Sequence, residues 1–192
     1  MSIDVAASPW VLRWAHLVPA GGTVLDLACG SGRHARLFAA RGCAVTACDR
    51  DVQALAALSG VPGIETRCAD LEDGSPWPFA AGRFTAIVVT NYLYRPLLPQ
   101  LAAALAPDGI LIYETFAAGN ERHGKPSNPD FLLRPGELLD VFGSLLHVAA
   151  FEQGEVTRPK PASIQRLCAA RRAAGEPSFD GGNRFRGLPL EA

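Results

Sequence analysis

The chain has 192 residues, 48% of them hydrophobic, and a formal net charge of −1 at pH 7. This length and composition predict one globular domain with a sizeable core, and the near-neutral charge gives no general electrostatic attraction to nucleic acid. The sequence shows neither a secretory signal pattern nor an apolar run of the roughly 18 residues that a membrane span needs, so we expect a cytoplasmic protein with no membrane partner.

Cysteine usage and local charge give two further expectations. The five cysteines, at positions 29, 43, 48, 68 and 168, show no C-x-x-C spacing. We therefore expect reduced, mostly buried thiols and neither disulfides nor a metal site. Residues 158–192 hold seven Lys and Arg against three Asp and Glu, whereas residues 1–157 hold 11 against 16. This basic end is interpreted as a solvated strand edge and tail, or as a surface that contacts RNA or protein.

The first predicted element is a helix that begins near residue 9. Ser8 followed by Pro9 is a typical helix start, because the serine side chain caps the helix and proline suits its first position. Trp10, Trp14 and Leu17 then share one face at helical spacing, which predicts that this face packs into the core.

Residues 24–34 predict a ligand-binding strand, turn and helix. Residues 24–27 form a short apolar strand, Gly30 and Gly32 form a tight turn, and a helix follows. Glycine lets a ligand approach the backbone, and the helix start presents free N–H groups and the positive end of the dipole to it. Asp26 lies near the carboxyl end of the strand, where it either contacts the ligand or caps the helix.

Two cofactor classes use this arrangement. Residues 30–35 satisfy the dinucleotide pattern G-x-G-x-x-G/A, which leaves an NAD-dependent oxidoreductase as an alternative. Asp26 favours the other class, because a carboxylate there would repel a pyrophosphate and attract the ammonium group of S-adenosylmethionine. The stretch resembles motif I of the class I S-adenosylmethionine-dependent methyltransferases, with Ala28 in place of the first glycine of that motif.

This resemblance, which covers residues 20–117, implies a fold and a cofactor. The fold is an α/β, Rossmann-like, doubly wound sheet of seven strands, mostly parallel with an antiparallel last strand, and the cofactor is S-adenosylmethionine. The resemblance also implies that the N-terminal helix covers the cofactor pocket. The motif residues that it assigns to cofactor binding are Asp26, Ala28, Cys29, Gly30 and Gly32.

Acidic residues after the next two predicted strands extend the cofactor site. Asp49 ends the second strand and is placed to accept hydrogen bonds from ribose hydroxyls. Arg50 is expected to lie against the adenine face. After the third strand, the resemblance implies that Asp70 bonds the adenine amino group and that the backbone of Leu71 meets a ring nitrogen. The second to fifth strands are predicted over residues 43–48, 64–69, 84–89 and 110–116.

The substrate side is predicted at the ends of the fourth and fifth strands. Asn91, assigned to the cofactor, and Tyr92 follow the fourth strand, at the corner where the resemblance places catalysis. The residues there do not spell the N-P-P-Y of enzymes that methylate planar amino groups. A turn over residues 106–109 precedes the fifth strand, near whose end Glu114 lies.

A polar loop over residues 117–134 is long enough to predict a lid or a binding loop. It contains His123, a candidate general base or anion contact. Tyr92, Glu114 and His123 are therefore the candidate catalytic residues for an acceptor whose hydroxyl or amine must lose a proton.

The end of the chain predicts a hairpin and a tail. Apolar and polar residues alternate over residues 145–155 and 163–172, which predicts two strands. Residues 1–174 are then one methyltransferase domain, and residues 175–192 a flexible tail rich in Gly, Pro and polar residues. Residues 131–138 resemble the small bacterial TehB-like and thiopurine methyltransferase-like proteins, which implies small, soft or thiol acceptors.

Together these features predict methyl transfer from S-adenosylmethionine to a small molecule, by a monomer or a homodimer. Basic residues near the strand ends are expected to attract an anionic acceptor: Arg95, Arg122, Lys125 and Arg134. A nucleic-acid substrate is disfavoured. The alternatives are an RNA or protein methyltransferase that uses the basic C-terminal end, an NAD-dependent oxidoreductase, and a protein that binds S-adenosylmethionine without catalysis.

Overall fold

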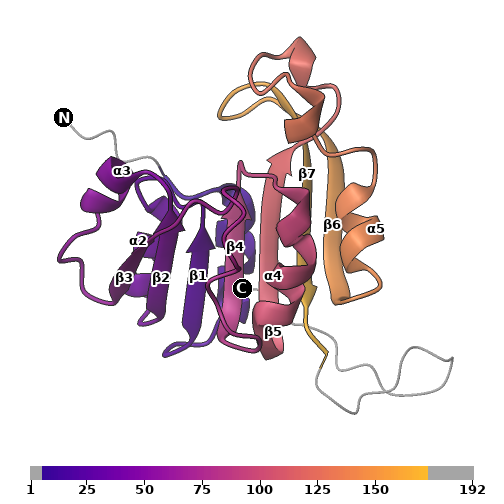
Figure 1. Ribbon diagram of the computed structural model, residues 1–192. Helices are drawn as coiled ribbons and strands as arrows, with labels where there is room; N and C mark the ends of the chain where they lie inside the picture. Colours follow the sequence, from indigo (N-terminus) through magenta and orange to yellow (C-terminus); the bar gives the residue numbers. More distant parts are fainter. Residues whose placement is uncertain (1–5, 173–192) are drawn as a thin grey trace, which may run out of the picture.

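The computed structural model describes residues 6–172, so the tail predicted over residues 175–192 lies outside the described residues. Seven strands form one sheet: β1 (Thr23–Leu27), β2 (Ala44–Asp49), β3 (Ile64–Cys68), β4 (Phe84–Thr90), β5 (Leu105–Phe116), β6 (His147–Val156) and β7 (Ala162–Ala170). Their order is β3-β2-β1-β4-β5-β7-β6 (Figure 1). β1 to β5 pair in parallel, whereas β7 is antiparallel to both of its neighbours. The predicted fold class is confirmed.

Helices cover both faces of the sheet. One face packs against α1 (Pro9–Trp14), the short 3-10 helix η1 (Ala15–Leu17), α2 (Arg33–Ala40) and α3 (Val52–Ala56). The other packs against α4 (Leu98–Ala104), which follows η2 (Arg95–Leu97), and α5 (Glu137–Phe142), both in front of the sheet in Figure 1. Two further 3-10 turns, η3 (Asn120–Arg122) and η4 (Pro129–Phe131), lie in the loop after β5.

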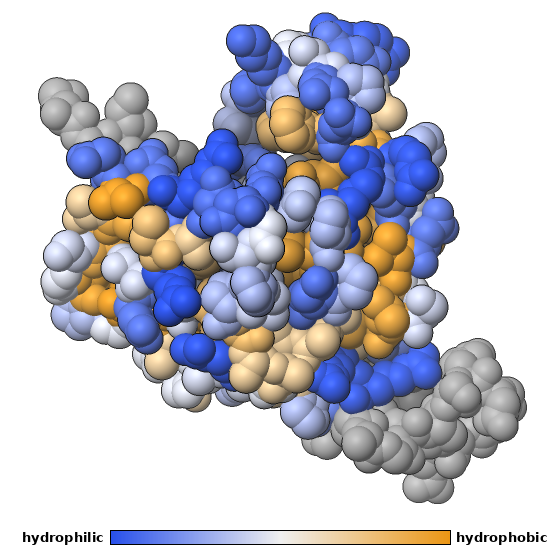
Figure 2. Space-filling model, in the orientation of Figure 1, coloured by the Kyte–Doolittle hydropathy of each residue, from blue (hydrophilic) through white to orange (hydrophobic). Residues whose placement is uncertain are grey.

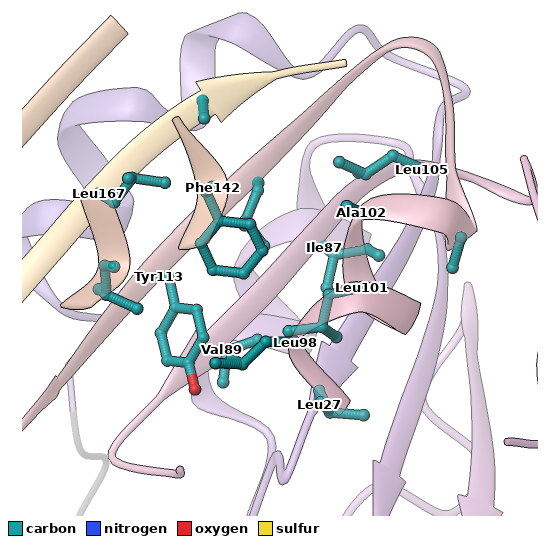
Figure 3. Packing of buried hydrophobic residues seen from close by; sticks show 14 of the residues in the cluster. Leu27, Ile87, Val89, Leu98, Leu101, Ala102, Leu105, Tyr113, Phe142 and Leu167 are labelled. Atoms are coloured by element: carbon teal, nitrogen blue, oxygen red, sulfur yellow. The ribbon is translucent and has the colours of Figure 1, made fainter. Parts of the chain in front are cut away.

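The α4 and α5 face holds a continuous apolar core (Figure 3). Leu98 and Leu101 of α4 and Phe142 of α5 pack against strand residues such as Ile87 and Tyr113, all at most 3% exposed. Because β4 is apolar on both sides, it lies at the centre of the sheet with helices on each face, as a buried parallel strand should. This packing fixes the strand ends that carry the polar residues described below.

The N-terminal helix packs as its apolar spacing predicts. The Ser8 side chain accepts a hydrogen bond from Trp10 N–H and so caps α1. Trp10 and Trp14 are each 1% exposed, and the Trp10 indole donates to the Leu167 carbonyl oxygen at 3.3 Å. The two rings therefore hold this helix on the sheet, which positions the residues that precede it.

The predicted turn over residues 106–109 takes a different form in the structure. These residues form a bulge within one long strand: Phe84 of β4 pairs with Leu105, and Ala86 pairs with Ile110. Asp108 has a positive φ of 60° there, and its N–H donates to the Arg171 carbonyl oxygen. The hydrogen bond to the chain after β7 holds the bulge beside the sheet, a long-range contact that local sequence does not show.

The expectation of mostly buried thiols is confirmed. All five thiols are free, with Cys68 exposed and the other four buried. Within residues 6–172 no group of three or more His, Cys, Asp or Glu side chains is arranged to hold a metal ion. No helix in the same part of the chain is long and apolar enough to cross a membrane.

Candidate functional site

A cavity of about 400 Å³, the first cavity, opens where the parallel strands end. Its walls come from the residues that follow β1 to β4 and from the last residues of β5, together with the loop after β5. The lining residues are Ala28, Asp49, Arg50, Ala69, Asp70, Leu71, Glu72, Asn91, Tyr92, Leu93, Thr115, Phe116, Pro126 and Phe131. Ligands of open α/β sheets bind at this edge.

The turn after β1 has the backbone geometry that its glycines suggest. Ala28, Gly30 and Gly32 have φ values of 52°, 53° and 76°, in the left-handed region. A Cβ at Gly30 would meet no atom within 4 Å, whereas one at Gly32 would collide with the Leu58 side chain. Gly30 therefore leaves open space beside the backbone, and Gly32 lets α2 pack closely against the residues after α3.

Asp49 connects this turn to the end of β2. Its Oδ2 accepts from Gly30 N–H at 2.7 Å, and its Oδ1 accepts from Asp51 N–H at 2.9 Å. Each oxygen of a carboxylate can accept a second bond, so the group can also receive ligand hydroxyls while it holds the turn.

Asp26 faces away from the first cavity. The side chain is 1% exposed, and its Oδ2 accepts from Ala35 N–H in the first turn of α2 at 2.8 Å. Burial raises the pKa of Asp26 to about 7, although the Ala35 bond acts in the opposite direction. The helix-capping alternative describes this contact, so a direct bond from Asp26 to a ligand ammonium is not supported by its position.

The remaining cofactor candidates divide between the cavity wall and the layer behind it. Arg50 and Asp70 face each other across the cavity edge, with Arg50 Nη1 and Asp70 Oδ2 3.8 Å apart. Cys29 lies behind the wall: it is buried, and its N–H donates to the Cys48 carbonyl oxygen. Leu71 and Asn91 line the first cavity with Ala28 and Asp49.

A second cavity of about 930 Å³ adjoins the first. Asn91, Phe116, Pro126 and Phe131 line both, so the two spaces meet at these residues. The other walls come from the segment at the start of α1, the end of β5 and the loop after it, and the turn between β6 and β7 with the start of β7. In Figure 1 this loop and this turn project together beyond one end of the sheet, and Figure 2 shows mainly hydrophilic residues on the outside of that end.

Glu114 is the acidic residue that faces the second cavity, and its charge is compensated. Its Oε1 accepts from the Ser8 hydroxyl at 2.7 Å, and its Oε2 lies 3.4 Å from Arg166 Nη1. Arg166 also donates from Nε to Glu152 at 2.8 Å and lies over the Trp10 ring. Ser8 N–H in turn donates to His34 Nε2 at 3.1 Å. This network ties the N-terminal segment to β5 and β7 at the cavity wall.

The three candidate catalytic residues do not come together. Tyr92 lines the first cavity and Glu114 the second, while His123 lies 3.5 Å from Glu155 and lines neither. Burial, with Glu72 nearby, raises the pKa of Tyr92 well above its ordinary value, so its hydroxyl stays protonated. The structure thus gives no support for a base assembled from these three groups.

The basic residues at the second cavity differ from those that the sequence suggested. Of the four expected there, Lys125 lines it. Arg95 and Arg134 instead bind Glu137, at 2.7 and 3.3 Å; although burial opposes it, their hydrogen bonds lower the pKa of Glu137 to about 2. Arg122 pairs with Glu155. The cavity residues that sequence reasoning missed are Arg33, Arg158, Lys160 and Arg166.

Comparisons with known proteins show what this chain resembles. Residues 24–109 match a family described as a methyltransferase domain. A search of curated protein sequences finds no significant match. The family match and the sheet order with its antiparallel β7 confirm the resemblance to the class I S-adenosylmethionine-dependent methyltransferases.

Three solved structures with the same fold illustrate the range of similarity. A methyltransferase from Methanosarcina mazei has 16% identity and a TM-score of 0.67, over 88% of this chain and 100% of that one. TehB from Haemophilus influenzae has 18% identity and a TM-score of 0.68, over 85% and 61%. A Burkholderia thailandensis 1,6-didemethyltoxoflavin-N1-methyltransferase, with that compound and S-adenosylhomocysteine bound, has 19% identity and a TM-score of 0.61, over 85% and 76%. These similarities show a shared fold and leave the acceptor open.

The first cavity fits the cofactor S-adenosylmethionine by its size and its chemistry. Its volume lies within the range of about 300–1,000 Å³ that small-molecule sites occupy. Asp49 and Asp70 present acceptors for hydroxyl and amino groups, while Leu71 and Leu93 present apolar surface for a purine.

The contacts of Asp49 predict the effect of removing its carboxylate. We expect Asp49→Ala to weaken S-adenosylmethionine binding by roughly 1–3 kcal/mol, because ligand donors lose a part-buried acceptor and Gly30 N–H loses its partner. Titration calorimetry measures the change. Asp49→Asn is the matched control, since one amide oxygen remains, and it should lose less. An unchanged affinity in Asp49→Ala would remove this residue from the site.

Proposed function

We propose that the protein is an S-adenosylmethionine-dependent methyltransferase that acts on a small-molecule acceptor. The observation that carries this proposal is the meeting of two cavities at Asn91, Phe116, Pro126 and Phe131. One cavity suits the cofactor, and the other is enclosed by the N-terminal segment, the loop after β5 and the β6–β7 turn. A donor in one cavity and an acceptor in the other would therefore meet at these four residues.

In this proposal the protein mainly binds and orients the two molecules. Asp49, Asp70 and Leu71 hold the cofactor, and when bound S-adenosylmethionine supplies an electrophilic methyl group on a sulfonium. Phe116 and Phe131 form the apolar part of the junction between the two sites. Such positioning supplies much of the rate enhancement of a displacement reaction.

The side chains around the junction suit an acceptor that carries no proton to remove. Glu114 is engaged by Ser8 and Arg166, Tyr92 stays protonated, and His123 lies outside both cavities. An anionic oxygen, a thiolate or an ionised chalcogen needs no general base. The geometry therefore supports these acceptors better than an alcohol or an amine.

Transfer of labelled methyl groups tests the proposal. The full chain is incubated with methyl-labelled S-adenosylmethionine and cell extract separated into metabolites, RNA and protein. We expect label in the metabolite fraction, and loss of that label in Asp49→Ala. Label in RNA alone or in protein alone would contradict the small-molecule assignment. Binding of S-adenosylmethionine without label in any fraction would contradict an enzymatic role.

A further inference from the structure

The second cavity is much larger than a small inorganic acceptor requires. A water molecule takes up about 30 Å³, so an oxyanion of three to five heavy atoms would fill on the order of a tenth of the 930 Å³ present. Tight sites enclose most of their ligand's surface. An acceptor that fills this space is therefore an organic molecule with a body of considerable size.

The inner wall of the second cavity is apolar. Phe116 and Ile164 come from β5 and β7, Val156 and Ala162 lie at the ends of the β6–β7 turn, and Phe131 comes from η4. The Phe131 side chain is 50% exposed although it is aromatic, so a ligand beside it would remove a large apolar surface from water. This wall favours a hydrophobic body in the ligand.

Positive charge surrounds the same space. Arg33, Lys125, Arg158 and Lys160 line it, and within residues 6–172 none of the four forms an ion pair with a carboxylate. Arg166 does not add to this excess, because Glu114 and Glu152 take up its charge. Four cations without acidic partners around a cavity attract a negatively charged ligand.

We propose that the second cavity binds an amphipathic organic anion, with an apolar body against Phe116, Phe131 and Ile164 and a carboxylate, sulfonate or phosphate group among Lys125, Arg158 and Lys160. This inference rests on the proposed function, since it assigns the class of acceptor. It also gives a role to part of the basic C-terminal end, because Arg158 and Lys160 belong to that end and face this cavity. A small inorganic oxyanion is excluded as the ligand that fills it.

Three probes that separate charge from apolar body test this assignment by binding, without any turnover. The first is 1-anilinonaphthalene-8-sulfonate; the second is N-phenyl-1-naphthylamine, which has the same rings and no charge; the third is sulfate. Each is titrated into the full chain saturated with S-adenosylhomocysteine, by calorimetry and fluorescence. We expect one bound sulfonate per chain, binding of the neutral compound at least tenfold weaker, and no displacement of the sulfonate by millimolar sulfate beyond a matched ionic-strength control.

Variants locate the bound probe. Lys160→Ala and Arg158→Ala should each weaken sulfonate binding by about 3- to 10-fold and leave the neutral compound unchanged, whereas Lys160→Arg should retain binding. Phe131→Ala should weaken both ring compounds. Arg41→Ala, which removes an equal charge at the far end of α2, should change nothing.

Two results would overturn the proposal: equal affinities for the charged and neutral rings, or sulfonate binding that is insensitive to Lys160 and Arg158. Displacement by sulfate at micromolar concentration would instead assign the cavity to an inorganic oxyanion. None of these results depends on methyl transfer. Failure of this inference is thus distinguishable from failure of the proposed function, which the labelling experiment measures.

Discussion

Replacing Gly30 with valine should abolish S-adenosylmethionine binding while the chain stays folded, whereas the same replacement at Gly32 should destabilise the fold itself. Both glycines have positive φ, so both variants incur backbone strain of about 1–2 kcal/mol. They differ in surroundings. The space beside Gly30 is open and adjoins Asp49, while Gly32 is packed against Leu58. A side chain at Gly30 therefore blocks the ligand, and one at Gly32 adds an overpacking cost of about 1–3 kcal/mol.

Gly21→Val is the matched control for strain. Gly21 also has a positive φ of 77° and open space, but it lies before β1, at the opposite end of that strand. Thermal unfolding should show similar losses for Gly21→Val and Gly30→Val and a larger loss for Gly32→Val. Calorimetry should show at least 100-fold weaker cofactor binding for Gly30→Val and unchanged binding for Gly21→Val. Full binding by Gly30→Val would mean that the cofactor does not approach this turn.

The second prediction concerns the stability of the fold between pH 4.5 and 6.5, and it depends on two buried groups. Burial raises the pKa of Asp26 to about 7 and lowers that of His34 to about 3, so both are neutral in the folded chain over this range. In the unfolded chain Asp26 is ionised above about pH 4, and His34 is protonated below about pH 6.5. Their contributions to the pH dependence therefore have opposite signs.

The signs follow from which state binds more protons. The Asp26 contribution is fully present below about pH 4 and is lost as the pH rises through 7. The His34 contribution is fully present above about pH 6.5 and is lost as the pH falls through 3. Between pH 4.5 and 6.5 each changes the free energy of unfolding by up to about 1.4 kcal/mol per pH unit, in opposite directions. We expect the wild-type stability to vary little across this window.

Asp26→Asn removes the Asp26 contribution to the pH dependence of stability and leaves the His34 contribution. The amide oxygen can still accept from Ala35 N–H, but the variant no longer gains stability on acidification. Urea unfolding should show that Asp26→Asn loses on the order of 2 kcal/mol more than wild type between pH 6.5 and 4.5. Asp140→Asn, at an exposed position of α5, should follow the wild-type curve. Parallel curves for wild type and Asp26→Asn would contradict the neutral, buried state of Asp26.

The lining of the first cavity was predictable because its residues follow strands that are recognisable locally. Asp49 and Asp70 each come directly after an apolar or alternating run, and parallel strands bring such ends to one edge. Asp26 shows the limit of this reasoning. Its spacing to the glycines is the same whether it faces a ligand or accepts from Ala35 N–H, and the close start of α2 brings that N–H within 2.8 Å.

The acceptor side was predictable only in part. Arg158 and Lys160 lie in a turn more than 40 residues after β5, and the insertion of β7 between β5 and β6 brings that turn to the end of β5. Local patterns do not contain this long-range arrangement. His123 was misleading for the same reason, because its partner Glu155 comes from β6. The alternating pattern correctly predicted the β6–β7 hairpin. It did not predict where the side chains of that hairpin lie, because their position depends on the strand order of the whole sheet.

The two cavities are lined largely by different parts of the chain, so their linings can change independently in evolution. Of the residues that line the second cavity, Arg33 and Asn91 alone fall within residues 24–109, the part that matches the methyltransferase family. The remaining walls come from the first few described residues, the end of β5 and the loop after it, and the β6–β7 turn with the adjoining ends of both strands. Under the proposed assignment of the two cavities, substitutions in residues 157–161 would therefore alter the acceptor without changing the segment that matches the methyltransferase family. Changes in one short surface turn would then be enough to alter the selectivity for the acceptor, in evolution or by design.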